Sequence, residues 1–327
     1  MKLKKCAALL LVSSCLLTGC TTSSAKKVDS KYVVASLEKG NKTKNIFADN
    51  LYKDIIDNSS NNSTVFNAVL QNLVDQKFPV NDDMKEDAAT IIKQIKSAYK
   101  SNYGDNYKDS LNQALTSAGY KNLSEYRQKM IKQIQYANFL LDYIDDHFDD
   151  VFNDYYQQCA PKYVSLIKIS VSDTSSPTDD ETSKLNEVKE LISNTDKSFG
   201  DIAQDYSNDS TSSKKGSLGI VDSKDTSGIA NSYGKDVFNA IEALSEGQVS
   251  DVITGDNGYY FVKVTSTDKK TLKKELKKTD IDSPLLAYDD YLQYVVYNSY
   301  KINYKDKDIK KIVQEVVNKA LEERKTE

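Results

Sequence analysis

Few residues in this chain could carry nucleophilic or metal chemistry. It holds four cysteines and a single histidine, His147. Cys159 is the only cysteine beyond residue 20, and one thiol with one imidazole favours a plain boundary residue over a Cys–His nucleophile. Six aspartates lie around His147 between Asp142 and Asp154, a pattern more typical of a solvated face than of a metal site. The sequence assigns no role to Cys159 or His147, and it implies no metal and no cofactor.

The residues before Cys20 suggest a covalent modification of that cysteine. Three lysines within the first five residues precede an apolar run from Cys6 to Leu17, and about 12 residues are too few to cross a membrane, which needs ~20. The run ends in Leu17-Thr18-Gly19-Cys20, which resembles the bacterial lipobox and implies cleavage before Cys20 and attachment of lipid to its sulfur. The alternative is an ordinary secretory signal. We expect a signal peptide at 1–19 and a lipidated tether at 20–27.

Removal of residues 1–19 leaves 308 of 327 residues and takes away three lysines, so the formal net charge moves from −4 to −7. An acidic surface argues against a nucleic-acid partner. Cys6 and Cys15 leave with the signal and the sulfur of Cys20 carries lipid, so Cys159 has no partner for an intramolecular disulfide.

The flanking parts of the mature chain, 28–158 and 267–327, show helical periodicity. In the first, apolar stripes begin near Phe66, Ile91 and Tyr126, and Ser124 is the expected N-cap of the third helix. The second carries two further stripes. Because a striped helix must cover its apolar face, we expect these two parts to pack together as one discontinuous domain.

The middle part, 160–266, mixes strand and helix patterns. We expect a strand at Tyr163–Val171, helices near Leu185–Ile192 and Phe199–Tyr206, a short strand at Leu218–Val221, a helix at Val237–Leu244 and a closing hairpin from Val249 to Val264. The order β-α-α-β-α-β-β predicts a compact antiparallel sheet flanked by helices.

Four phrases of this middle part resemble the parvulin family of peptidyl-prolyl isomerases, and their order and spacing carry the resemblance. They are Phe199 to Ser210, Gly216-Ser217-Leu218-Gly219, Ala243 to Ser250 and Asn257 to Val264. With the lipobox and the helical flanks, nearly the whole chain resembles the PrsA-type foldases of Gram-positive bacteria.

This resemblance implies an α+β fold: a parvulin-like antiparallel sheet with flanking helices, inserted in a mostly α-helical, SurA-like chaperone domain. It also implies a lipid-anchored protein on the extracytoplasmic face of the cell membrane. The expected partners are unfolded or newly secreted proteins, and a homodimer stays open.

The resemblance to parvulins also implies which residues form the site. Parvulins usually carry one histidine on the first strand and one on the last, clustered with an Asp or Cys. Here Ser165 and Tyr260 stand at those two positions, and Asp209 matches the acidic member. An apolar proline pocket would use Leu218 with Val237 or Phe238. Leu218 and Phe238 could equally be ordinary core, and Asp209 a loop or turn residue.

Prolyl isomerisation needs no nucleophile, because rotation about the X–Pro amide transfers no proton and crosses a barrier of ~18–20 kcal/mol. An apolar grip and hydrogen bonds that favour the twisted amide are sufficient. Two functions therefore remain: a surface-tethered folding catalyst, or a client-holding chaperone whose parvulin domain is degenerate. A solute-binding lipoprotein is disfavoured because the two-lobed βαβ pattern is missing.

Overall fold

The computed structural model describes residues 27–39, 42–194, 196–277 and 280–326. These residues form two compact units: a larger unit, Asn81–Asp290, and a smaller unit made of the residues up to Val80 and those from Tyr291 onward. The units divide at other points than 159 and 267, and the predicted domain division stays a prediction. In the described part of the chain, no helix is both long enough and apolar enough to cross a membrane. The predicted signal and Cys20 lie outside the described residues.

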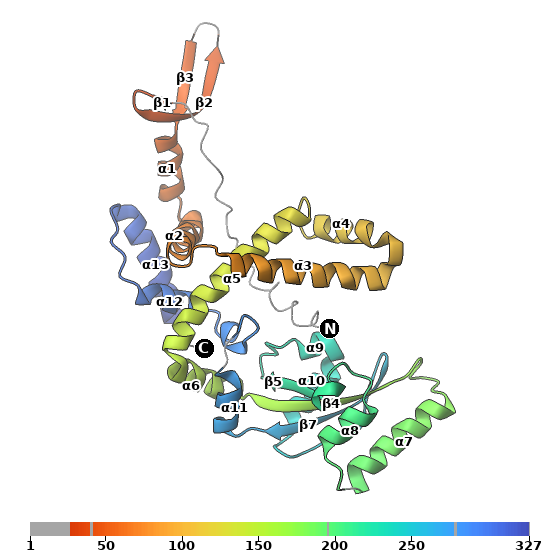
Figure 1. The fold of residues 1–327 in the computed structure, drawn as a ribbon. Coiled ribbons are helices and arrows are strands. Elements are labelled where there is room, and N and C mark those ends of the chain that lie inside the picture. Colours follow the sequence, from red (N-terminus) through yellow and green to blue (C-terminus); the bar gives the residue numbers. More distant parts are fainter. Residues whose placement is uncertain (1–26, 40–41, 195, 278–279, 327) are drawn as a thin grey trace. The chain divides into compact units, whose positions relative to one another are not determined.

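The larger unit contains a four-stranded antiparallel sheet (Figure 1) in the order β5-β4-β7-β6. Its strands are β4 (Lys162–Ser170), β5 (Ser217–Val221), β6 (Ile253–Gly255) and β7 (Gly258–Ser266). The predicted closing hairpin is present as β6–β7, although β6 has three residues and Val249 makes only an isolated bridge to Lys263. A Cβ at Gly258 would lie 2.3 Å from the Ile169 carbonyl oxygen, so this hairpin requires glycine there.

Helices cover both faces of this sheet. They are α7 (Asp179–Asn194), α8 (Phe199–Tyr206), α9 (Ile229–Tyr233) and α10 (Lys235–Ala243). Helices α7 and α8 pack on the face formed by Ile167, Ile169 and Phe261. Helices α9 and α10 pack on the other face, formed by Val164, Leu166 and Val262. The predicted α+β class is therefore confirmed, with one short helix, α9, that the sequence pattern did not predict.

Lys162, the first residue of β4, caps the C-terminal end of α10. Lys162 Nζ donates to the carbonyl oxygens of Ile241, Glu242 and Leu244 at 3.0, 2.7 and 3.0 Å. The last carbonyls of a helix lack partners within the helix and carry partial negative charge, so an ammonium group there satisfies both needs. The contact fixes α10 against β4.

The rest of the larger unit is helical. It comprises α3 (Asp82–Tyr103), α4 (Tyr107–Ser117), α5 (Leu123–Asp146), α6 (Phe148–Cys159) and α11 (Lys269–Leu276), with short 3₁₀ helices η4 (Gly104–Asn106), η5 (Ser212–Lys214) and η6 (Pro284–Leu286). Helix α5 begins one residue before Ser124, and its N-cap is Asn122, whose side chain accepts from Glu125 N. The expected cap at Ser124 is thus corrected. His147 separates α5 from α6 and stacks on Tyr143 at a centroid distance of 4.1 Å.

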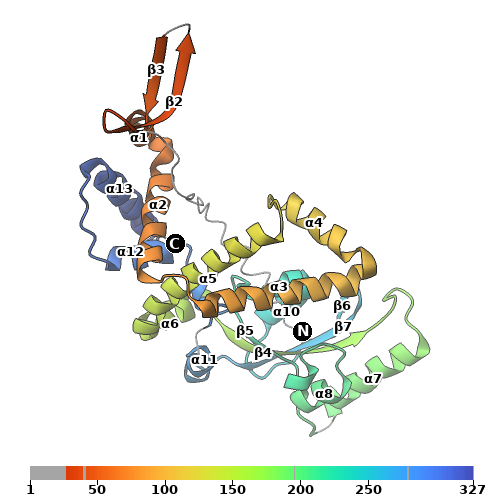
Figure 2. The same ribbon diagram turned by 45° about the horizontal axis from the view of Figure 1, so that its top comes forward.

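The smaller unit joins segments from both ends of the described chain. It contains β1 (Lys27–Val28), β2 (Lys31–Lys39), β3 (Lys42–Phe47), α1 (Ala48–Asp57), η3 (Ser59–Asn61), α2 (Asn62–Lys77), α12 (Leu292–Ser299) and α13 (Lys307–Glu323). Figure 2 shows α12 and α13 beside α2. There the Phe66 ring stacks on Tyr294 at 4.9 Å and meets Tyr297 edge-on at 5.1 Å. The antiparallel order β1-β2-β3 was not predicted from the sequence.

Candidate active site

Asp209 lies in the loop after α8 and is 6% exposed. Its Oδ1 accepts hydrogen bonds from the backbone N and the Oγ1 of Thr211, at 2.9 and 2.8 Å. The loop is fastened to β4, because Asn208 N donates to the Lys168 carbonyl at 2.7 Å and Lys168 N donates to Ser207 Oγ at 3.0 Å. The carboxyl group is therefore held in a fixed position beside the sheet.

Tyr233, the last residue of α9, reaches this carboxyl group. Its hydroxyl donates to Asp209 Oδ1 at 3.3 Å, and its ring meets the Tyr260 ring edge-on at 6.2 Å. Burial, followed by the charge of Asp209, raises the pKa of Tyr233 above its ordinary value. Tyr233 is thus a neutral hydrogen-bond donor in the neutral pH range. Tyr233 was not among the site residues predicted from the sequence.

Tyr260 stands on β7 and is 4% exposed. Its hydroxyl donates to Asn257 Oδ1 at 2.7 Å, in the β6–β7 turn. A Cβ on Gly255 would lie 2.7 Å from the ring, so glycine on β6 makes room for the tyrosine. Burial, followed by the charges of Asp209 and Asp256, raises the pKa of Tyr260.

Ser165 is separated from these residues. It lies on β4, paired with Ser217 on one side and Lys263 on the other. Successive side chains of a strand point to opposite faces. Leu166 packs in the same cluster as Tyr260, whereas Ile167 belongs to the opposite face. The structure brings Asp209, Tyr233 and Tyr260 together and places Leu166, not Ser165, on their face of the sheet.

The predicted apolar pocket residues lie in this same cluster. Val237 is 1% exposed and belongs to the core beneath α10. Leu218 and Phe238 are half-buried and pack against the cluster from β5 and α10. Tyr233 is also half-buried and packs against the same cluster, and we call Leu218, Phe238 and Tyr233 the apolar wall. Leu218 and Phe238 can therefore meet a ligand directly, whereas Val237 can act only by supporting them.

A second buried aspartate holds α9 in place. Asp222 is 0% exposed and follows β5. Its Oδ2 accepts from the Tyr155 hydroxyl of α6 at 2.8 Å and from Thr226 Oγ1, and its Oδ1 accepts from Lys224 N at 3.0 Å. In the loop that these bonds fix, Asp225 accepts from the first backbone N–H groups of α9. This loop thereby determines where α9 presents Tyr233.

Cys159 ends α6 next to this loop and is 0% exposed. Its carbonyl oxygen accepts from Ser223 N at 2.9 Å. Burial, followed by the charge of Asp222, raises the pKa of the thiol to about 11. A protonated, enclosed thiol is a poor nucleophile, which agrees with the boundary role favoured by the sequence.

Comparison with known proteins gives a match in this region. Residues 166–266 match the family model of the rotamase, described as a PPIC-type PPIASE domain. Two curated relatives, each named "Foldase protein PrsA", come from Staphylococcus epidermidis and Staphylococcus aureus. Each is 32% identical over 141 residues, 41% of this chain and 41% of the relative. The match therefore spans about two fifths of the length of these curated relatives.

Solved structures with weaker similarity include PrsA from Bacillus subtilis, at 21% identity and TM-score 0.40, covering 86% of this chain and 97% of that one. A PrsA from Streptococcus pneumoniae has 21% identity and TM-score 0.38, covering 85% and 98%.

The sheet, its helices and the family match define residues 166–266 as a parvulin-type peptidyl-prolyl isomerase domain. The parvulin resemblance predicted from the four phrases is confirmed: they lie in the part of the chain that matches the rotamase family model and is similar to curated PrsA foldase proteins.

Proposed function

We propose that this chain is an extracytoplasmic foldase, which holds unfolded or newly secreted proteins and isomerises their prolyl bonds through residues 166–266. The observation that carries the proposal is the buried Asp209 carboxyl group, with Tyr233 and Tyr260 beside it at the edge of an apolar wall. The domain match and the name of the curated relatives support it.

The chemistry follows from these groups. A proline ring would lie against Leu218 and Phe238, which are half-buried and open to solvent. The two tyrosines stay protonated because their pKa values are raised, so their hydroxyls can only act as hydrogen-bond partners there. Contacts that favour the twisted, less conjugated amide lower the rotation barrier, and no bond is made or broken.

We expect weak activity. The Tyr233 hydroxyl is already bonded to Asp209 and the Tyr260 hydroxyl to Asn257, so a substrate must compete for both donors. The test is NMR exchange spectroscopy of a prolyl peptide with the mature chain. Asp209→Ala should lower the exchange rate, and Ser165→Ala should leave it unchanged. Equal rates for wild type and Asp209→Ala would contradict this site.

The second candidate is a client-holding chaperone without catalysis. It is favoured by the position of Ser165, which faces away from the cluster, so the first expected imidazole has no polar replacement on the correct face. Suppression of aggregation of an unfolded protein, together with no enhancement of peptide exchange, would select this candidate.

Anchoring belongs to the same proposal. The phrase Leu17-Thr18-Gly19-Cys20 supports cleavage by a signal peptidase and acylation of Cys20. Acyl chains contribute roughly 0.8 kcal/mol per buried CH₂, so two or three would give durable attachment. Cys20→Ala should release protein to the medium or leave uncleaved precursor. Unchanged processing and anchoring would exclude the lipobox.

The smaller unit supports self-association as part of this proposal. Helix α1 exposes Leu51, Tyr52 and Ile55, each to about 45%. An amphipathic helix with an uncovered stripe needs a partner surface. Sedimentation velocity of wild type and of Leu51→Ser with Ile55→Ser tests a homodimer, and a wild-type monomer at tens of micromolar would exclude it.

A further inference from the structure

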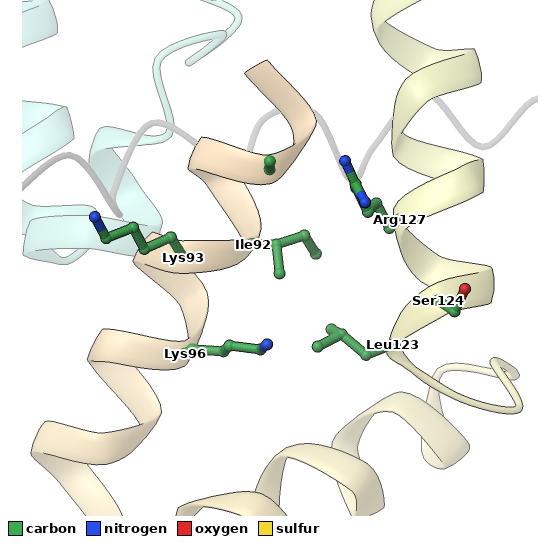
Figure 3. Close-up of a pocket in the computed structure, with 7 residues that line it drawn as sticks. Ile92, Lys93, Lys96, Leu123, Ser124 and Arg127 are labelled. Carbon is green, nitrogen blue, oxygen red and sulfur yellow. The ribbon is translucent and has the colours of Figure 1, made fainter. Parts of the chain in front are cut away.

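A groove of about 430 Å³ lies in the larger unit between α3 and α5, far along the sequence from the Asp209 cluster. Its apolar lining comes from Ala89 and Ile92 on α3 and Leu123 on α5. Figure 3 shows Ile92, Leu123 and Lys96 pointing into the space between the helices, with Arg127 at one end and Lys93 directed away.

The floor of this groove suits an aliphatic side chain. Ile92 is 7% exposed and Leu123 is half-buried, so both present a fixed apolar surface. A space of this size admits one or two side chains of a bound segment, which makes it a subsite within a longer contact.

Two cations in the groove have no anionic partner among the described residues. Lys96 is exposed and makes no ion pair there, and its nearest charged neighbours along α3, Lys93 and Lys100, are also cationic. Arg127 donates from Nη2 to the Lys85 carbonyl at 3.3 Å, while its buried Nε finds no acceptor in the described part of the chain. Because Nε itself is enclosed, a carboxylate in the groove would meet the Arg127 guanidinium at its Nη groups, with a charge-assisted hydrogen bond.

We infer that this groove binds a segment of unfolded polypeptide in which a carboxylate side chain stands beside an aliphatic one. The carboxylate lies between Lys96 and Arg127, and the aliphatic group lies on Ile92 and Leu123. This inference rests on the proposed foldase function and names the client chemistry that the helical part selects. The charge complementarity is local, because the chain as a whole carries a formal net charge of −4.

The test uses fluorescence anisotropy with the mature chain and labelled peptides of equal length, built around Leu-Glu-Leu, Leu-Gln-Leu, Leu-Lys-Leu and Ser-Glu-Ser. We expect Leu-Glu-Leu to bind at least fivefold more tightly than Leu-Gln-Leu and than Ser-Glu-Ser. Lys96→Gln and Arg127→Gln should each remove most of the Glu-over-Gln preference. Lys100→Gln removes the same charge one turn further along α3, outside the groove, and should retain the preference.

A charge-reversal variant distinguishes a lost contact from a misfolded protein. Lys96→Glu should bind Leu-Lys-Leu more tightly than Leu-Glu-Leu, and an unfolded variant would not gain this preference. The inference is overturned if wild type does not discriminate Glu from Gln, or if Lys100→Gln acts as strongly as Lys96→Gln. It is also overturned if Ser-Glu-Ser and inorganic polyphosphate bind as tightly as Leu-Glu-Leu, which would define a polyanion site.

A parallel assay separates this inference from the proposed function. If wild type suppresses aggregation of an unfolded protein but does not discriminate the peptides, the groove inference fails alone. If wild type discriminates the peptides but suppresses no aggregation, the foldase proposal fails and the groove keeps its chemistry.

Discussion

Asp209 and Asp222 are both buried aspartates of the larger unit, and they differ in how their carboxyl oxygens are used. Both oxygens of Asp222 accept hydrogen bonds, from Tyr155, Lys224 and Thr226. Asp209 accepts all of its hydrogen bonds on Oδ1, and its Oδ2 has no partner among the described residues. A carboxyl group with both oxygens occupied supports the fold, and one with a remaining oxygen beside an accessible apolar wall can meet a ligand. Asp222 is therefore a structural aspartate, and Asp209 is a candidate functional one.

The largest expected effect is on stability. Asp222→Ala removes several hydrogen bonds and leaves the Tyr155 hydroxyl buried without an acceptor, so we expect a loss of roughly 2–4 kcal/mol in the free energy of unfolding. Asp209→Ala loses bonds mostly within its own loop and should cost roughly 1 kcal/mol. Urea unfolding followed by circular dichroism measures both, and equal losses would contradict the different roles assigned to the two aspartates.

Removing the tyrosine hydroxyl that donates to each aspartate tests the same difference between Asp222 and Asp209. Tyr155→Phe removes a 2.8 Å bond to the fully buried Asp222 and should cost roughly 1–2 kcal/mol. Tyr233→Phe removes a 3.3 Å bond to Asp209 and should cost less than half as much. Because this change removes one of the hydrogen bonds to Asp209 Oδ1, the one donated from α9, it should also alter the isomerisation rate, whereas Tyr155→Phe should not. A larger destabilisation from Tyr233→Phe would reverse the assignment.

The stability at alkaline pH tests whether the Cys159 thiol, next to Asp222, is enclosed. The folded-state pKa of Cys159 is raised to about 11, whereas an unfolded thiol titrates near ~8.5. The unfolded state therefore releases its proton first, and the contribution of the thiol to stability is lost as pH rises from ~8.5 to 11. The free energy of unfolding should fall with pH between 8.5 and 10, less steeply in Cys159→Ser. Identical slopes in the two proteins would place Cys159 in contact with solvent.

The smallest effect concerns imidazoles at the two strand positions. Leu166→His with Tyr260→His puts both rings on the face of Asp209, and we expect a rise in isomerisation despite some loss of stability from a polar ring in the core. Ser165→His with Tyr260→His puts the first ring on the opposite face and should give no rise. Peptide exchange rates at equal folded concentration decide, and a gain only with Ser165→His would refute the face assignment.

The apolar periodicity of residues 160–266 was enough to predict the sheet and most of its helices. Strands and helices have different periods, and turn residues lie between them. The sequence did not predict which residue of β4 faces Asp209. A shift of one residue moves a side chain to the other face of the sheet, and Ser165 and Leu166 are adjacent. Nothing in the spacing of apolar residues distinguished the two.

Tyr233 was missed for a different reason. Helix α9 has five residues, too short for periodicity, and it depends on Asp225 accepting from Ile229 N and Ala230 N. The usable signal was an aspartate shortly before Gly228 and an apolar residue, which is typical of a helix start. The strands β2 and β3 were missed because Lys31–Lys39, with the sequence KYVVASLEK, holds a short apolar run rather than the alternation typical of a half-buried strand.

We propose that Asp209 belongs to a working site whose function is separable from client holding. The direct measurement is prolyl peptide exchange and aggregation suppression on the same preparations of wild type and Asp209→Ala, with Asp222→Asn as a control for stability. We expect roughly tenfold slower exchange in Asp209→Ala, with unchanged suppression of aggregation. The loss should be smaller than the about two to three orders of magnitude that one preorganised polar group contributes in a strong active site, because the tyrosine donors here are already hydrogen-bonded. Unchanged exchange in Asp209→Ala, with wild type clearly faster than buffer, would contradict this proposal.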